Sequence, residues 1–175
     1  MISRSIIFAA ALALAGPAMA QTDEDRATVS DLLHDLAQMM TDKDLVGLYD
    51  SEPPALREYS ADFWGVSQER QREAMRRLMA NPDEVGATEN PAFSLDAAEW
   101  GVSPAGRDYA VIPFSFVARA PNFVTLRHIH VLALTEDDQW YLLRVSGRLD
   151  MEFVVEAYPD LAGLDIPEQV LEPAP

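Results

Sequence analysis

The sequence FVTLRHIHVLALTED, residues 123–137, is mostly apolar and holds two of the chain's three histidines. It belongs to a series of four similar segments in the second half of the chain, which cover residues 92–103, 108–119, 123–134 and 139–147. Segments rich in β-branched and aromatic residues are typical of strands, and only short turn-like sequences separate these four. Connections this short join antiparallel neighbours, so the sequence predicts an antiparallel meander.

Two details of this half lead to specific expectations. Pro113 lies inside a strand that has neighbours on both sides, where it lacks the N–H of a ladder hydrogen bond. We therefore expect a β-bulge at Pro113 that bends the sheet. After Gly147, residues 148–158 favour a closing helix capped by Asp150, although the apolar run 153–155 also suits a strand.

The first half of the chain has helical patterns. Residues 22–40 carry apolar side chains at helical spacing, with Thr22 and Asp25 placed to cap the first turn. Residues 44–49 indicate a short second helix, which a proline pair ends. A further helix is expected from Ser67 onward. The sequence thus predicts helices followed by an antiparallel sheet, an α+β arrangement.

The helix that begins near Ser67 has an apolar side and a basic side. We expect the apolar side to belong to the core; it consists of Ala74, Met75, Leu78 and Met79. The basic side consists of Arg70, Arg72, Arg76 and Arg77. Glu69 and Glu73 lie one turn away, which favours a salt-bridged, solvated face over an anion-docking patch. Phe63 and Trp64 precede this helix and are expected to plug one end of the fold, with protein docking as the alternative.

The composition excludes several classes of function. The chain has 13 Lys and Arg against 29 Asp and Glu, a formal net charge of -16, so it repels phosphate backbones and nucleic-acid binding is not expected. It has no cysteine, which excludes disulfides and thiolate metal sites. Hydrophobic residues make up 49% of the chain, a proportion typical of a globular protein rather than a disordered one.

The first 20 residues have the pattern of a secretory signal peptide. A single Arg4 precedes an apolar run, a Gly-Pro pair and the small residues Ala18 and Ala20. The apolar run is too short to cross a bilayer as a permanent anchor. We therefore expect cleavage after Ala20 and a periplasmic or secreted mature protein without a membrane span. The expected organisation is a signal peptide at 1–20, one α+β domain at 21–160, and an acidic, proline-containing tail at 161–175.

The order of these elements, together with DKDLVGLYDSEPP at residues 42–54, resembles the NTF2-like (SnoaL-like, cystatin-like) superfamily. The resemblance implies a cone-shaped α+β roll, in which a curved antiparallel sheet wraps around the long first helix and leaves a pocket at the wide end. It also implies that the outer sheet face often forms a homodimer. Members range from isomerases and dehydratases to proteins without known catalysis, so the resemblance predicts no reaction. The acidic base and the tyrosine–carboxylic acid pair of the ketosteroid-isomerase branch have no match here, position by position.

His128 and His130 share one face of their strand, because side chains two residues apart point the same way. If Thr135 lies opposite Gln139, His130 lies across from Arg144. A turn shifted by one residue replaces these partners by Tyr141, Leu143 and Val145, so the register decides the face. The first register, extended to the preceding strand, gives a candidate ligand pocket formed by Ile112, Phe114, Phe116, His128, His130, Trp140 and Arg144.

Three interpretations of the histidine pair stay open at this point: a structural role within the sheet or a dimer face, a ligand pocket or weak enzyme site, and a His-x-His metal site. The structural role is favoured, and no metal or other cofactor is expected, since no carboxylate neighbours the pair in sequence. Motifs for a nucleophile elbow, a phosphate loop or a zinc protease are missing, so we assign no catalytic residue.

We therefore expect a protein that binds a small apolar or anionic molecule, or a partner, in an apolar pocket. The first alternative is a pocket enzyme of isomerase or hydrolase type that uses His128 or His130 as its acid–base group. The second alternative is an accessory protein-interaction domain.

Overall fold

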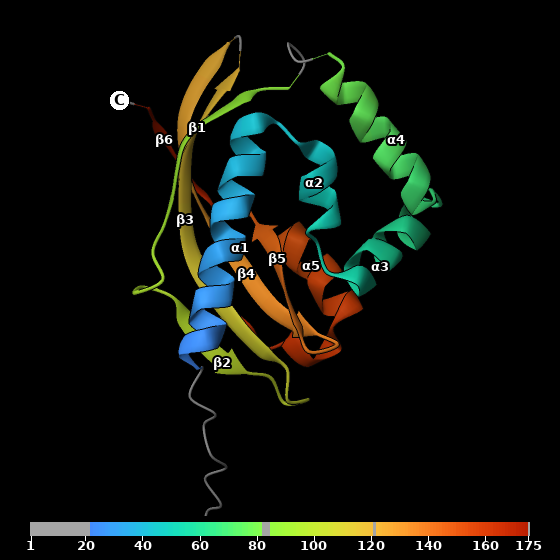
Figure 1. Cartoon of the computed structure of the whole chain (residues 1–175), viewed down its shortest axis with the longest axis vertical. Coiled ribbons are helices and arrows are strands. Elements are labelled where there is room, and N and C mark those ends of the chain that lie inside the picture. Colours follow the sequence, from blue (N-terminus) through green and yellow to red (C-terminus); the bar gives the residue numbers. More distant parts are fainter. Residues whose placement is uncertain (1–21, 82–84, 121, 175) are drawn as a thin grey trace, which may run out of the picture.

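The computed structural model describes residues 22–81, 85–120 and 122–174, so the expected signal peptide lies outside the described residues. Within them the chain has an α+β fold of five α-helices, one short 3-10 helix and six strands in one open antiparallel sheet (Figure 1). The helices are α1 (Asp23–Asp42), α2 (Leu45–Asp50), α3 (Pro54–Trp64), α4 (Gln68–Met79), α5 (Arg148–Ala157) and η1 (Pro159–Leu161). The strands are β1 (Ala87–Phe93), β2 (Glu99–Val102), β3 (Asp108–Ala120), β4 (Phe123–Glu136), β5 (Gln139–Val145) and β6 (Val170–Pro173). No helix among the described residues has the length and hydropathy needed to cross a membrane.

The centre of the sheet is the long antiparallel pair β3 and β4, as the short connection between them predicted. Each of these strands is flanked on its other side by two shorter strands. β1 and β2 both pair with β3, and β5 and β6 both pair with β4. The antiparallel arrangement expected from the sequence is therefore confirmed, with β6 as an addition from the tail.

Pro113 does not produce a bulge in β3, so that prediction is wrong. The register between β3 and β4 continues without a shift through Pro113, which lies opposite His130. The bulge lies in β1 instead, between Glu89 and Ala92. On the other side of β3, β1 ends opposite Phe114 and β2 begins opposite Val111, so Pro113 faces the gap between these two strands. No ladder partner is lost there, which is why a proline fits inside this strand.

The helix α1 covers one face of the sheet (Figure 1). Its first turn is closed by the predicted capping box between Thr22 and Asp25. The Asp25 carboxylate also accepts a hydrogen bond from Nε1 of Trp140 in β5, at 3.0 Å. The buried stripe of α1 packs with sheet residues into a first core, whose largest members include Leu33, Ile112 and Phe114.

A second core lies on the opposite face of β4 and β5. It contains Leu132 and Val145 from the sheet, Val154 from α5 and Leu56 from α3. The tail contributes as well, since Ile166 is buried in this core before the chain adds β6 to the edge of β4. Both faces of this end of the sheet are thus covered by protein.

A polar network attaches α3 to this end of the sheet. The Glu136 carboxylate accepts a hydrogen bond from the backbone N–H of Ala55, at 3.2 Å, and another from the Tyr158 hydroxyl. The Arg107 guanidinium donates to Asp160 and lies over the Tyr158 ring. Burial of the Tyr158 ring raises the pKa of its hydroxyl, which therefore stays protonated as a donor. This network fixes where α3 begins.

The helix α4 packs against α2 and α3 and buries none of its residues. The expectation that its apolar side belongs to the core is wrong, because Leu78 and Met79 are 44% and 36% exposed. The expectation that Phe63 and Trp64 plug one end of the fold is wrong as well, since they are 56% and 64% exposed. The reason is position: α4 stands away from the sheet and packs on the small helices α2 and α3, so part of its apolar side stays exposed (Figure 1).

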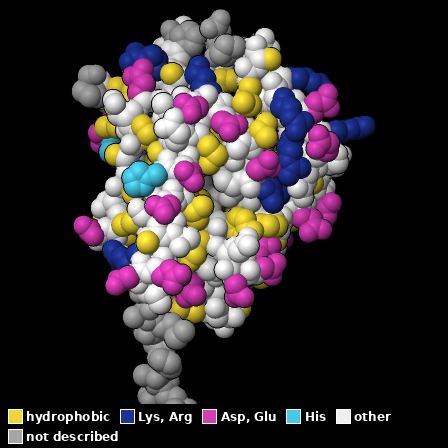
Figure 2. Space-filling model, viewed as in Figure 1, with side chains coloured by type: hydrophobic (Ala, Val, Ile, Leu, Met, Phe, Trp, Pro, Cys, Tyr) yellow, Lys and Arg dark blue, Asp and Glu magenta, His cyan; other side chains and the backbone are white. Residues whose placement is uncertain are grey.

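The basic side of α4 is a salt-bridged surface, as expected. Figure 2 shows Lys and Arg side chains gathered over this helix with acidic side chains beside them. Three of the four arginines form ion pairs, namely Arg72 with Asp50 at 2.7 Å, Arg76 with Glu69 at 3.1 Å, and Arg77 with Glu73 at 2.6 Å.

Candidate functional site

The turn between β4 and β5 decides where the candidate pocket residues lie. Asp137 and Asp138 form a two-residue turn in which both have positive φ, 50° and 61°. As a result Thr135 lies opposite Trp140 rather than opposite Gln139. Of the two registers that the sequence allows, the structure has the second, in which the partner of His130 is Val145.

This shift divides the expected pocket between the two faces of the sheet. Ile112, Phe114, Phe116 and Trp140 belong to the first core or pack against it, on the face that α1 covers. Arg144 lies on the same face, opposite Val131. His128 and His130 lie on the other face, which they share with Leu132 of the second core. The structure thus separates the two histidines from Arg144.

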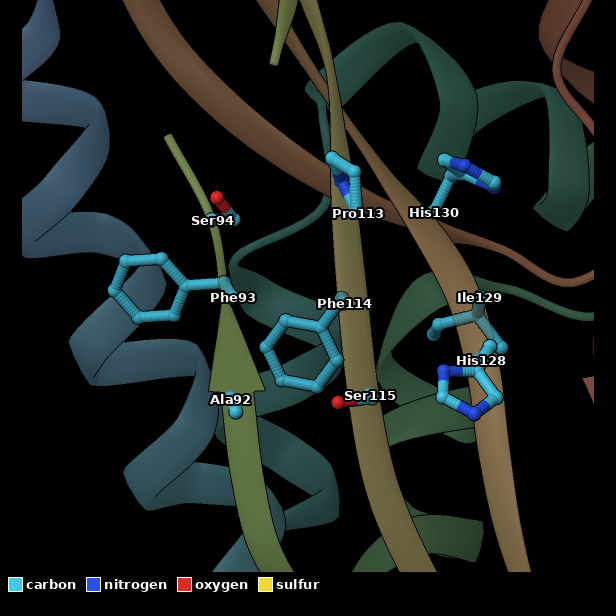
Figure 3. A pocket seen from close by; sticks show the side chains of 9 residues that line it. All are labelled: Ala92, Phe93, Ser94, Pro113, Phe114, Ser115, His128, Ile129 and His130. Carbon is cyan, nitrogen blue, oxygen red and sulfur yellow. The ribbon is translucent and has the colours of Figure 1, made fainter. Parts of the chain in front are cut away.

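The histidines lie beside an open hollow of about 290 Å³ on that second face. Figure 3 shows His128 and His130 projecting from β4 next to Pro113 and Ser115 of β3. The Nδ1 atom of His130 is buried without a hydrogen-bond partner, and His128 is exposed at the surface. Glu172 of β6 stands 3.8 Å from Nε2 of His128, which is beyond hydrogen-bond distance.

This hollow does not bring together a hydrogen-bonded acid–base pair, although Glu172 lies within ion-pair distance of His128. No hydrogen bond joins either imidazole to a second titratable group among the described residues. In the same part of the chain, no group of three or more His, Cys, Asp and Glu side chains could hold a metal ion. The chemistry available to the pair is therefore that of single imidazoles.

A larger cavity lies between α2, α3 and α4, and we call it the α4 groove. It is open to solvent and has a volume of about 550 Å³, within the usual range for small-molecule sites. Its apolar walls come from Trp64, Val66, Met75 and Leu78, the side chains that α4 and the end of α3 leave uncovered. Its polar lining includes Tyr49, Glu52 and Ser60 on one side and Arg70 on α4.

Local sequence places Tyr49 and Glu52 in this groove. The Asp44 carboxylate caps α2 by accepting the N–H of Gly47 at 2.9 Å. A Cβ atom at Gly47 would approach that carboxylate to 2.4 Å, so a larger residue here would displace the side chain that caps α2. α2 ends at Asp50 and α3 begins at Pro54, a residue that favours a helix start. Glu52 is held in the link between the two helices.

Tyr49 has a buried hydroxyl without a partner. The side chain is only 4% exposed, and its oxygen makes no hydrogen bond within the described residues. The guanidinium groups of Arg57 and Arg72 stand near its ring, at 6.0 Å and 5.4 Å from the centroid. Burial raises the pKa of the hydroxyl, so it stays protonated. A buried hydroxyl without a partner is unfavourable. The Tyr49 side chain that carries it is one of the walls of the groove.

Glu52 is a carboxyl that titrates near neutral pH. Burial raises its pKa to about 7, and this effect outweighs the attraction of Arg144 and Arg57. No hydrogen bond or ion pair holds its carboxyl within the described residues. Both protonation states of Glu52 are therefore populated at neutral pH, in a groove whose walls are apolar.

The charges around Glu52 and Tyr49 come from several elements. Arg57 and Arg72 both reach Asp50, at 3.8 Å and 2.7 Å. Arg144 is exposed at the surface, although enough protein surrounds its guanidinium for burial to lower its pKa. Asp150 of α5 acts on both Glu52 and Arg144. The groove is thus a locally basic region of an acidic protein.

Neither Tyr49 nor Glu52 stands out as a site residue in the sequence. Both lie in the segment 42–54, where a tyrosine and a glutamate beside two prolines look like an ordinary helix end. The relevant signals are burial and the lack of partners, and these exist only after α3 and α4 fold back over α2. Ser67 did predict where α4 begins, since its hydroxyl accepts from Arg70 N–H.

Comparison with family models, with curated proteins and with solved structures finds no significant match to this chain. Its function must therefore be inferred from the geometry of the groove and of the hollow.

Proposed function

We propose that this protein binds a small molecule with a substantial apolar part in the α4 groove. The observation that carries the proposal is the combination, in one apolar cavity, of the buried Tyr49 hydroxyl without a partner and the Glu52 carboxyl with a pKa of about 7. A ligand that fills the groove covers exposed apolar side chains and supplies the missing hydrogen bond.

The loose packing of α4 supports this role. A helix without buried residues can move away from α2 and α3 at low cost, which lets a ligand enter and then contact both sides of the groove.

The proposal includes export after Ala20 and a cone-shaped roll of NTF2-like type, supported by the pattern of residues 1–20 and by the order of elements. Mass spectrometry of the exported protein should give Gln21 as the first residue; a chain that retains Met1 contradicts the export.

The groove can be tested with an uncharged fluorophore such as N-phenyl-1-naphthylamine. We expect its fluorescence to rise on binding, with energy transfer from Trp64, which lines the groove. The variant Trp64→Phe should keep binding but lose most of the transfer. Met75→Arg should block binding, because Met75 lines the groove.

The matched control is Met79→Arg on the same helix, at an exposed position outside the groove lining. It should bind as the unmodified protein does. Equal loss in the Met75 and Met79 variants, or no binding by the unmodified protein, contradicts the proposal.

A second candidate is a pocket enzyme at the histidine hollow. The observation in its favour is the buried Nδ1 of His130 without a partner, next to an open cavity. It predicts slow hydrolysis of an activated ester such as p-nitrophenyl acetate that decreases on substitution of His130 by Gln. His34 is a surface histidine of α1, so His34→Gln is the control. If the His130→Gln variant hydrolyses the ester as fast as the His34→Gln variant does, this candidate is ruled out.

A further inference from the structure

We propose that the ligand of the α4 groove is an acidic amphiphile, an apolar chain with a carboxylate head, and that Glu52 takes up one proton when it binds. This inference rests on the proposed function and names the chemical class of its ligand.

The head of the ligand is placed by the polar lining of the groove. Tyr49 offers an O–H donor that has no acceptor within the described residues. Protonated Glu52 offers a second O–H donor, and Ser60 a third hydroxyl, on the same side of the groove. A carboxylate has two oxygens that accept several hydrogen bonds, and such bonds to a charged acceptor are stronger than neutral ones. Donors without acceptors favour a ligand that brings acceptors.

The sign of the head is set by the charges that surround it. The charged groups that act on Glu52 or on Tyr49, or that line the groove, are Arg57 on α3, Arg70 and Arg72 on α4, Arg144 on β5, Asp50 on α2 and Asp150 on α5. Four arginines face two aspartates, so the surroundings carry a net positive charge when Glu52 is protonated. In a chain with a formal net charge of -16, this region is an exception. It attracts an anion and repels an amine.

The proton on Glu52 follows from the same arrangement. An ionised Glu52 would stand beside the carboxylate of the ligand, and two like charges in an apolar cavity repel each other strongly. A protonated Glu52 removes that repulsion and donates a hydrogen bond instead. Because the pKa of Glu52 is about 7 before binding, the proton is available near neutral pH. Binding then strengthens as the pH falls through 7.

The tail of the ligand lies along the apolar walls. Trp64, Val66, Met75 and Leu78 all line the groove, which has a volume of about 550 Å³. Trp64 and Leu78 are 64% and 44% exposed without a ligand, so covering them releases a large area of apolar surface from water. A ligand that has a charged head but no apolar tail would lose this contribution to binding.

The experiment compares three ligands with the same tail: dodecanoate, dodecanol and dodecylamine. Each is titrated against the bound N-phenyl-1-naphthylamine at about pH 6 and about pH 8. With a pKa of about 7 for Glu52, its protonated fraction falls roughly tenfold between these two conditions. We expect dodecanoate to bind about tenfold more tightly at the lower pH, dodecanol to bind equally at both, and dodecylamine to bind most weakly.

Two variants assign the effect to residues. Glu52→Gln cannot ionise, so it should bind dodecanoate equally at both pH values, with the affinity of the unmodified protein at the lower pH. Tyr49→Phe lacks the donor and should bind dodecanoate about tenfold more weakly at both pH values while keeping the pH dependence. Glu58→Gln, an exposed carboxyl on α3 outside the groove lining, is the matched control and should behave as the unmodified protein.

The outcomes separate this inference from the function on which it rests. If the fluorophore binds and dodecanoate fails to displace it, or if dodecylamine binds more tightly, the acidic ligand is excluded while the groove remains a binding site. If dodecanoate binds with the same affinity at both pH values, the proton uptake is excluded. If the fluorophore itself does not bind, both the function and the inference fail.

Discussion

Glu52 illustrates how one residue obtains its chemistry from its surroundings. In sequence it is one of many acidic residues, and it stands next to two prolines that end one helix and begin the next. In the fold the carboxyl is partly buried beside the groove, and this burial raises its pKa to about 7. Arg144 and Arg57 attract its negative charge, but they stand too far away to form an ion pair with it.

The dependence of protein stability on pH tests whether the pKa of Glu52 is raised. The folded-state pKa of Glu52 lies above the ordinary value of 4.5, so the folded protein binds the proton more tightly than the unfolded chain does. The contribution of Glu52 to stability is therefore full below pH 4.5 and is lost as the pH rises to about 7. Glu52→Gln should remove this loss.

We expect Glu52→Gln to match the unmodified protein near pH 4 and to exceed its free energy of unfolding by up to about 3 kcal/mol at pH 8. Urea denaturation across this pH range measures the difference. Glu58→Gln should follow the unmodified protein throughout. A Glu52→Gln curve parallel to that of the unmodified protein means that Glu52 has an ordinary pKa.

Among the elements, the β4–β5 turn and α4 have the largest consequences for the site. The turn has two residues in the left-handed region, and this length sets which side chains face α1 and which face α5. α4 is amphipathic, yet it lies where the sheet cannot cover it, so its apolar side becomes the wall of a groove rather than part of a core. Neither the turn nor α4 has an unusual sequence, and their effect on the site comes from the elements packed around them.

Asp138→Gly should stabilise the β4–β5 turn. Asp138 has a φ of 61°, a region that is unfavourable for residues with a Cβ atom and favourable for glycine. We expect an increase in the free energy of unfolding of about 0.5–1 kcal/mol, and a decrease for Asp138→Val, both measured by urea denaturation. A loss of stability in the glycine variant would contradict this account of the turn.

Hydrogen exchange should distinguish α4 from α1. α1 buries Leu33 and three other residues in the first core, whereas α4 buries none. We expect the amides of α4 to exchange orders of magnitude faster than those in the middle of α1, as measured by mass spectrometry. Adding the fluorophore should slow exchange in α4 and leave α1 unchanged. Equal protection of the two helices without ligand would exclude a movable α4.

For the molecule as a whole, two cores on opposite faces of one sheet provide the stability, and the excess of acidic residues opposes it. The two cores share the strands β4 and β5, so α1 on one face and α5 on the other are joined through them. A net charge of -16 spread over this surface repels itself, although the region around α4 is basic.

Salt should therefore stabilise the folded protein. Raising NaCl from about 10 mM to about 200 mM screens repulsion between exposed carboxylates, and we expect the melting temperature to rise by a few degrees. Circular dichroism measures it. The double variant Asp31→Lys and Asp35→Lys, at two exposed positions of α1, should show a smaller rise. A melting temperature that falls with salt would mean that ion pairs such as Arg72 with Asp50 outweigh the repulsion.

The sequence by itself determined the α+β class, the capped first helix and the antiparallel pairing of β3, β4 and β5, because these depend on local periodicity and short connections. The faces of the sheet, the place of Pro113 opposite a gap, and the site in the α4 groove required the folded chain. A register shift of one residue moves every side chain of a strand to the other face of the sheet, and the sequence is compatible with both registers. Burial of Tyr49 and Glu52 depends on helices that come after them in the chain, so no local pattern could reveal the missing partner or the raised pKa.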